Sequence, residues 1–147
     1  MERRQVDPDQ LSLLLQARRA ERITQDEVTA WVDAHADAAS SQLKRTTYLK
    51  LRRGDPQPAF LECLAACQNC TQVYQAGEFR DYQDFEQCDD RLRSASGVFT
   101  PVPAPAWYTA PAHILGGEVL YQCQQCEAIW RLILPERVQR GSWCRIG

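Results

Sequence analysis

Histidine and glycine are both scarce in this sequence, which has only two histidines and seven glycines among 147 residues. The two histidines, His35 and His113, lie far from the cysteine pairs described below, so a histidine-containing catalytic metal site is not predicted. The sequence also has no glycine-rich phosphate loop, no nucleophile elbow and no His-Glu-x-x-His helix. These absences predict that the protein is not an enzyme.

Long apolar runs are missing as well. No segment approaches the ~18 consecutive apolar residues of a membrane span. The N-terminal segment, 1–9, is polar and lacks the apolar core of a signal peptide. We therefore expect a cytoplasmic protein without a membrane partner, in a reducing compartment where the seven cysteines serve metal sites or the core more often than disulfides.

Two Cys-x2-Cys pairs, Cys67/Cys70 and Cys123/Cys126, are the most informative feature of the sequence. Cysteines at this spacing let both thiolates of one tight turn reach the same metal ion, and two such turns complete a tetrahedral zinc shell. We predict these four residues as the ligands of a structural Zn²⁺. The 52 residues between the pairs make this pattern less specific than a compact four-cysteine cassette.

Other interpretations of the pairs stay open at this point. Cys67 and Cys70 could lie in one continuous helix with buried thiols. A thioredoxin-like redox motif would open a helix after a strand, whereas the segment after Cys126 has the pattern of a strand. The first pair and the cysteine before it also invite comparison with the cluster loop of radical S-adenosylmethionine enzymes, but the chain is too short for their barrel. No role is assigned to Cys63, Cys88 and Cys144.

Charge is distributed unevenly along the chain. Residues 1–53 carry 10 basic and 8 acidic groups, residues 54–100 carry 3 and 8, and residues 101–147 carry 4 and 3. Nucleic-acid binders normally show a concentrated basic field, so the acidic centre indicates a protein partner rather than nucleic acid. The simpler interpretation of these acids is a solvated helix face. The residues predicted to form an acidic partner-binding surface are Asp81, Asp84, Glu86, Asp89 and Asp90.

Apolar periodicity predicts helices through most of the first two thirds. We expect a first helix capped by Asp7 that begins at Pro8, a second after the capping box at Thr24, and a third from Ser40 or Ser41 to Arg53. A helix starting at 58 either ends at the first cysteine pair or continues past it. Residues 79–92 have the pattern of an amphipathic helix with an acidic outer face.

The composition changes at residues 94–97, and the prolines at 101, 103 and 105 then exclude helix. Strands are expected near 118–123, 128–134 and 142–146, the first two joined by the turn of the second cysteine pair. The predicted fold class is α+β, with an N-terminal helical layer and a small C-terminal antiparallel zinc-ribbon-like sheet. We expect one compact unit built from a helical region 1–93, a proline-rich connector 94–117 and a hairpin region 118–147.

Residues 120–132 contain the second cysteine pair and an aromatic strand, and Pro135-Glu136 and 141–143 follow them. This C-terminal stretch resembles the end of small cytoplasmic immunity proteins from bacterial toxin systems. Segments within 14–31 are similar to helical parts of such families. This resemblance implies a non-enzymatic antidote, of a type VI or contact-dependent system, that binds a cognate toxin and occludes its active site.

The sequence departs from the usual knuckle pattern in one respect. Zinc knuckles usually have glycine after the second cysteine, whereas Thr71 and Glu127 occupy these positions here.

The alternative function is a zinc-ribbon adaptor or transcription-associated module that binds protein or nucleic acid. A basic groove on the folded surface would favour this alternative.

Overall fold

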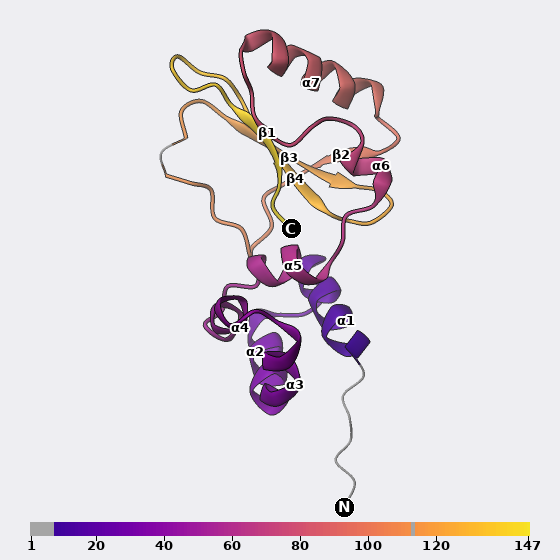
Figure 1. The fold of residues 1–147 in the computed structure, drawn as a ribbon, viewed down its shortest axis with the longest axis vertical. Coiled ribbons are helices and arrows are strands. Elements are labelled where there is room, and N and C mark those ends of the chain that lie inside the picture. Colours follow the sequence, from indigo (N-terminus) through magenta and orange to yellow (C-terminus); the bar gives the residue numbers. More distant parts are fainter. Residues whose placement is uncertain (1–7, 113) are drawn as a thin grey trace, which may run out of the picture. The chain divides into compact units, whose positions relative to one another are not determined.

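The structure, a computed structural model, describes residues 8–112 and 114–147. Its fold is α+β, as predicted, with helices toward the N-terminus and an antiparallel sheet of five strands formed mainly by the C-terminal part (Figure 1). The chain divides into two compact units. The helical unit runs to Leu64 and includes Pro105–Trp107, and the sheet unit comprises Ala65–Ala104 and Tyr108–Gly147.

In its described residues the helical unit contains five helices, whose apolar faces are buried. Those faces bury leucine, valine and phenylalanine side chains, including Leu15, Val28, Val32 and Phe60. None of the helices in the described part of the chain combines the length and the apolar character needed to span a bilayer. The helices are α1 (Pro8–Arg19), α2 (Gln25–Ala34), α3 (Ala36–Gln42), α4 (Arg45–Arg52) and α5 (Gln57–Cys63).

The start of α2 confirms the predicted capping box, because the hydroxyl of Thr24 accepts a hydrogen bond from the Glu27 amide at 3.2 Å. The predicted cap at Asp7 lies outside the described residues. The predicted third helix is instead two helices, α3 and α4, separated by the extended residue Leu43. The break is stabilised by Glu62 of α5, whose carboxylate accepts a hydrogen bond from the backbone N–H of Lys44 at 3.1 Å.

Trp107 belongs to the core of the helical unit although it lies far from the five helices in sequence. Its indole N–H donates to the carbonyl of Arg19 at 3.1 Å, and its ring meets the ring of Phe60 edge to face at 5.0 Å. The neighbouring Ala106 amide donates to the carboxylate of Glu21. The middle of the predicted connector is therefore a structural part of the helical unit.

The sheet unit is built on a five-stranded antiparallel sheet with the strand order β1-β5-β4-β3-β2. Three of its strands confirm the predicted positions to within two residues. β2 lies inside the predicted connector, and its Pro101 is tolerated because β2 is an edge strand. The strands are β1 (Gly77–Glu78), β2 (Phe99–Val102), β3 (Glu118–Cys123), β4 (Ile129–Ile133) and β5 (Ser142–Arg145).

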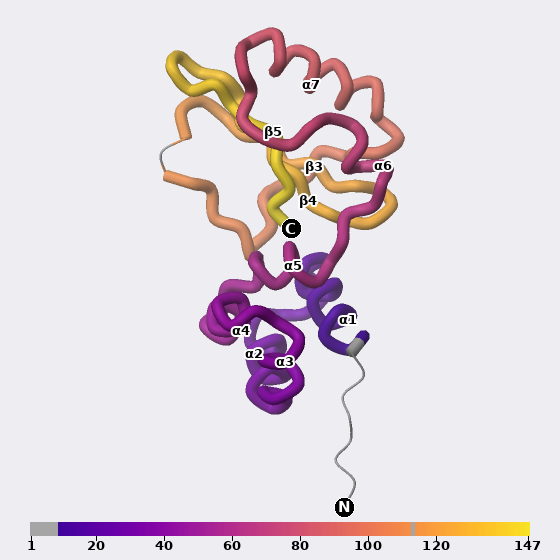
Figure 2. The backbone as a smooth tube through the Cα atoms, in the orientation of Figure 1, coloured from indigo at the N-terminus to yellow at the C-terminus, as the bar shows by residue number. Residues whose placement is uncertain are grey.

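Two helices complete this unit, α6 (Gln68–Thr71) and α7 (Tyr82–Ser94). α7 lies alongside the sheet (Figure 1) and packs Cys88 and Leu92 into the aromatic core on that face. Within this core the rings of Trp130 and Trp143 stack with centroids 5.2 Å apart. The trace in Figure 2 shows α6 beside the turn that joins β3 and β4, which brings the two cysteine pairs together.

Candidate metal centre and basic surface

The four predicted ligands, Cys67, Cys70, Cys123 and Cys126, form one cluster in the sheet unit. Their sulfur atoms all lie within 4.8 Å of one another, so together they could hold a single metal ion. The Sγ–Sγ distances are 3.8 Å for Cys67–Cys70, 3.6 Å for Cys67–Cys123 and 3.7 Å for Cys70–Cys126. These separations exclude disulfide bonds, whose sulfurs are about 2 Å apart. The structure thus brings the four predicted ligand residues together in one place.

The second cysteine pair sits in a tight turn after β3. The Glu127 amide donates to the Cys123 carbonyl at 2.9 Å, and the Cys123 amide donates to the Ala128 carbonyl at 2.9 Å. Backbone N–H groups of the turn, at Gln125 and Cys126, also donate to the sulfur of Cys123. Glu127 has φ +66°, the left-handed conformation that glycine supplies in most such turns. The turn therefore keeps its knuckle geometry without glycine, at the expense of strain at Glu127.

The first cysteine pair is held by a short helix instead of a second knuckle. α5 ends at Cys63 and the chain becomes helical again only at Gln68, so Cys67 is the N-cap of α6 and Cys70 lies within it. This excludes one continuous helix through the three cysteines. The Thr71 hydroxyl donates to the Cys67 carbonyl at 3.0 Å, which ties the helix to its cap. The position after Cys70 needs no left-handed residue in this arrangement.

Hydrogen bonds and burial shift the pKa values of the thiols in the cluster in opposite directions. A hydrogen bond from the Cys70 backbone N–H lowers the pKa of Cys67 to about 7. Desolvation raises the pKa of Cys70 and of Cys123, because burial penalises the thiolate. A bound cation reverses the effect of burial, since it stabilises the deprotonated sulfurs directly. The mixture of N–H donors and buried sulfurs thus suits a metal ion.

Trp130 supplies a further observation that fits a metal-bound thiolate. Its indole N–H is buried and has no hydrogen-bond partner of normal geometry. It nevertheless lies close enough to the sulfur of Cys70 to lower the pKa of that thiol. A buried donor is costly unless it faces an acceptor, and a thiolate is a much better acceptor than a thiol. Sequence reasoning assigned this tryptophan only to the core or an interface.

The three remaining cysteines are free and lie outside the cluster. Cys88 is completely buried on the inner side of α7, where desolvation raises the pKa of its thiol to about 12. Cys144 accepts a hydrogen bond from the guanidinium of Arg131 at 3.3 Å. Cys63 is partly buried at the end of α5. None of the three contributes a ligand to the candidate metal centre.

The five residues of the predicted acidic surface are not all exposed in the structure. Asp84 is only 8% exposed, because its carboxylate accepts hydrogen bonds from the hydroxyl of Tyr74 and from the backbone N–H of Arg80. The Tyr74 hydrogen bond is the main cause of the lowered pKa of Asp84. Asp84 thus lies on the inner side of α7, not on the outer face expected for it. It is unavailable to a partner.

The other four acidic residues of this set lie at or near the surface of α7. Asp81 caps the helix by accepting a hydrogen bond from the Asp84 amide at 2.8 Å. Asp89 forms an ion pair with Arg93 at 2.8 Å. Glu86 and Asp90 are exposed. The acidic field of α7 is therefore weaker than the sequence suggests.

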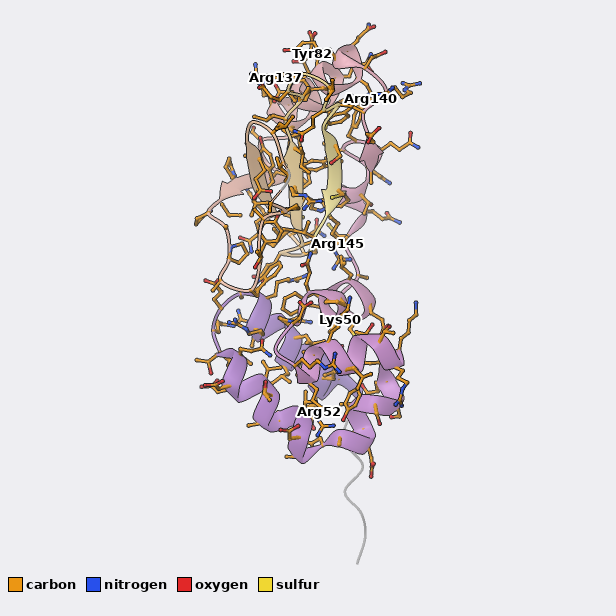
Figure 3. All side chains as sticks on the ribbon, turned by 90° about the vertical axis from the view of Figure 1, so that its left-hand side faces the viewer. Lys50, Arg52, Tyr82, Arg137, Arg140 and Arg145 are labelled. Atoms are coloured by element: carbon orange, nitrogen blue, oxygen red, sulfur yellow. The ribbon has the colours of Figure 1, made fainter. Side chains whose placement is uncertain are left out.

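Basic residues gather on α4 in the helical unit. Between Lys44 and Arg53 the chain carries five basic side chains and no acidic one. The inner side of α4 buries Thr47 and Leu51. Figure 3 labels two of the side chains that extend from α4 to the surface, Lys50 and Arg52. The sequence analysis missed these basic residues because residues 1–53, taken together, carry nearly equal numbers of basic and acidic groups. The exposed basic residues are Lys44, Arg45, Lys50, Arg52 and Arg53.

No protein-family model, curated protein or solved structure matches this chain. The cysteine cluster and the basic helix are therefore the observations on which a function can be argued.

Proposed function

We propose that the cysteine cluster holds a structural Zn²⁺. Zinc binds thiolates at about 2.3 Å in a tetrahedron, which places the sulfurs about 3.8 Å apart. The observed distances of 3.6–3.8 Å agree with this value. Four cysteine ligands fill the shell and leave no open position for a substrate or a water molecule, so the ion has a structural and not a catalytic role.

We infer that the protein is a non-enzymatic, cytoplasmic, transcription-associated module that contacts double-stranded DNA through α4. The observation that carries this proposal is the run of exposed basic side chains on α4. Phosphate neutralisation by lysine and arginine supplies most of the affinity of DNA binders, and a helix fits the major groove. The basic surface favours the transcription-associated module over the immunity protein that the sequence resemblance implies.

The packing of α4 is consistent with this role. α4 contacts α2, α3 and α5, and Glu62 of α5 also accepts a hydrogen bond from the Thr47 hydroxyl at 3.2 Å. The inner side of α4 is thus fixed while its other faces stay exposed, as in helices that enter the DNA groove. One of its arginines, Arg52, pairs with Asp33 at 3.6 Å. Both side chains are more than half exposed, so this pair is weak and a phosphate can replace the carboxylate.

The test is binding of the zinc-loaded full chain to a mixed-sequence 30-base-pair duplex, followed by fluorescence anisotropy at several salt concentrations. We expect the triple variant Arg45→Gln, Lys50→Gln, Arg52→Gln to bind more weakly and to reduce the salt slope by about 1 for each lost phosphate contact. The matched control is Arg91→Gln, Arg93→Gln on α7, which also removes positive charge. An absence of binding at low salt, or equal salt slopes in wild type and the triple variant, would exclude this function.

The second candidate is the immunity protein implied by the sequence resemblance, which would bind a cognate toxin and occlude its active site. The observation in its favour is that Glu86 and Asp90 remain exposed on α7, where they could face a basic toxin cleft. In a pull-down from the native host, a captured toxin should associate more slowly with a Glu86→Gln, Asp90→Asn variant at low salt. Equal association rates would remove α7 from the proposed interface.

A further inference from the structure

The proposed zinc centre leaves a charge that its own ligands do not neutralise. Four thiolates and one Zn²⁺ have a net charge of −2. Two of the sulfurs belong to buried cysteines, Cys70 and Cys123, which pack against Phe99 and Trp130. An uncompensated charge is unfavourable in such surroundings, because the apolar side chains solvate it poorly. The backbone N–H donors described above stabilise part of this negative charge, but they have no net positive charge with which to neutralise it.

One arginine lies beside the cluster on the same face of the sheet. Arg145 of β5 is the register partner of Trp130 on β4, and Trp130 packs in the core cluster that contains the ligand cysteines. Arg145 is partly buried, and its Nε donates to the backbone oxygen of Gly147 at 3.0 Å. The same oxygen accepts a hydrogen bond from the Ile129 amide at 2.8 Å, so the arginine is tied to the beginning of β4. Figure 3 labels Arg145 in the sheet unit.

The electrostatics of Arg145 agree with this placement. Burial lowers the pKa of its guanidinium, and the charges of Cys126 and Cys70 act in the opposite direction. These two cysteines come from different Cys-x2-Cys pairs, so one guanidinium interacts with both halves of the shell. A cation in this position attracts the zinc–thiolate centre more strongly than it would in bulk water, because the local dielectric constant is lower.

We propose that Arg145 is the counter-cation of the zinc–thiolate centre and slows the loss of its metal. The inference rests on the proposed Zn²⁺ site and is independent of the proposed DNA contact. Arg145 coordinates nothing itself and acts as a positioning residue through charge. Outer-shell partners of this kind typically change metal affinity by about 10–100-fold when they are replaced.

The test compares the zinc-loaded full-length protein with its Arg145→Gln and Arg145→Lys variants. Zinc content is measured first, and zinc release to excess chelator is then followed with a chromogenic indicator. We expect Arg145→Gln to release zinc about tenfold faster, whereas Arg145→Lys, which retains the positive charge, stays within about threefold of wild type. Arg140→Gln removes the same charge from an exposed position in the same unit and should release zinc at the wild-type rate.

Cobalt substitution separates a charge effect from misfolding. Each variant is loaded with Co²⁺, and retention of the sulfur-to-cobalt charge-transfer band shows that all four thiolates still bind the ion. Equal release rates for Arg145→Gln and wild type, or equally fast release from Arg145→Lys and Arg145→Gln, would overturn the role of Arg145 and leave the zinc site intact. If the wild-type chain holds no zinc, both the proposed zinc site and the role of Arg145 are overturned.

Discussion

The backbone N–H of Cys67 donates to the sulfur of Cys126, which lies 59 positions further along the chain, at 3.4 Å. This contact joins the N-cap of α6 directly to the turn after β3. The sulfur of Cys126 is therefore held in part by the backbone of the other cysteine pair. The candidate metal centre is thus also the place where these two distant segments of the chain are joined.

Replacement of Cys126 by serine should remove both a ligand and the acceptor for the Cys67 amide. We expect the free energy of unfolding of the sheet unit to fall by on the order of 5 kcal/mol, a fraction of the ~10–16 kcal/mol that a structural zinc supplies. The measurement is chemical denaturation of the zinc-loaded protein. Cys63→Ser is the matched control, since Cys63 lies outside the cluster. Equal losses for the two variants would contradict the assignment of Cys126 as a ligand.

Replacement of Glu127 by glycine should stabilise the sheet unit. The left-handed backbone of Glu127 costs about 1–2 kcal/mol, and the added freedom of the unfolded chain offsets about 0.4–1 kcal/mol of the gain. The expected net gain is therefore about 0.5–1 kcal/mol, measured as a shift in the denaturation midpoint. Glu86→Gly on α7 makes the same chemical change in a right-handed helix and should lower stability by about 1 kcal/mol. A destabilised Glu127→Gly variant would mean that the carboxylate has a role of its own.

Replacement of Trp107 by alanine should destabilise the helical unit by about 3–5 kcal/mol, because it empties a buried site. Trp107→Phe keeps an aromatic ring against Phe60 and loses the hydrogen bond to the Arg19 carbonyl. It should retain most of the stability that the alanine variant loses. Thermal unfolding followed by far-ultraviolet circular dichroism measures both. A Trp107→Ala variant as stable as wild type would show that this segment leaves the helical unit in solution.

Asp84 should make the stability of the sheet unit depend on acid pH. Its pKa is lower in the folded state than in the unfolded chain, where it is about 3.9. Its contribution is therefore fully present above that pH and disappears as the pH falls through the folded value. We expect the stability difference between wild type and Asp84→Asn to shrink as the pH falls below about 4.

The measurement for Asp84 is urea denaturation at a series of pH values, with Asp90→Asn as the control. Asp90 is exposed on the same helix and should give a small difference that changes little with pH. A constant difference between wild type and Asp84→Asn would show that the pKa of this carboxylate is the same in the folded and unfolded states. Protonation of the cysteine ligands affects all three proteins equally, so it cancels in the comparison.

The grouping of the four cysteines could be predicted from sequence because its signal is local. Each Cys-x2-Cys spacing specifies one turn, and the four cysteines then need only a common ion. Strands β3, β4 and β5 were predictable for the same reason, since short alternating or apolar segments were bounded by turn residues. The conformation of the two turns was not predictable, because a helix cap and a knuckle both satisfy the same spacing.

The contacts that were missed depend on distant partners. Nothing near Asp84 in the sequence shows that the Tyr74 hydroxyl and the Arg80 amide will enclose its carboxylate. The split between α3 and α4 likewise depends on Glu62, which caps α4 from another helix. The prolines at 101, 103 and 105 predicted an extended connector, whereas residues 99–102 pair with β3 as an edge strand. Helical periodicity and residue type contain no information about these long-range neighbours.

Trp107 has a practical consequence for dividing this protein. Its indole fills the core of the helical unit, yet the polypeptide reaches that position only after building β2 and returns afterwards to form β3. A recombinant fragment that stops at Leu64 would contain every helix of its unit and lack a side chain from the middle of its core. Expression trials, truncation series and domain-swap chimeras should therefore retain residues 105–107, or supply a substitute for that ring.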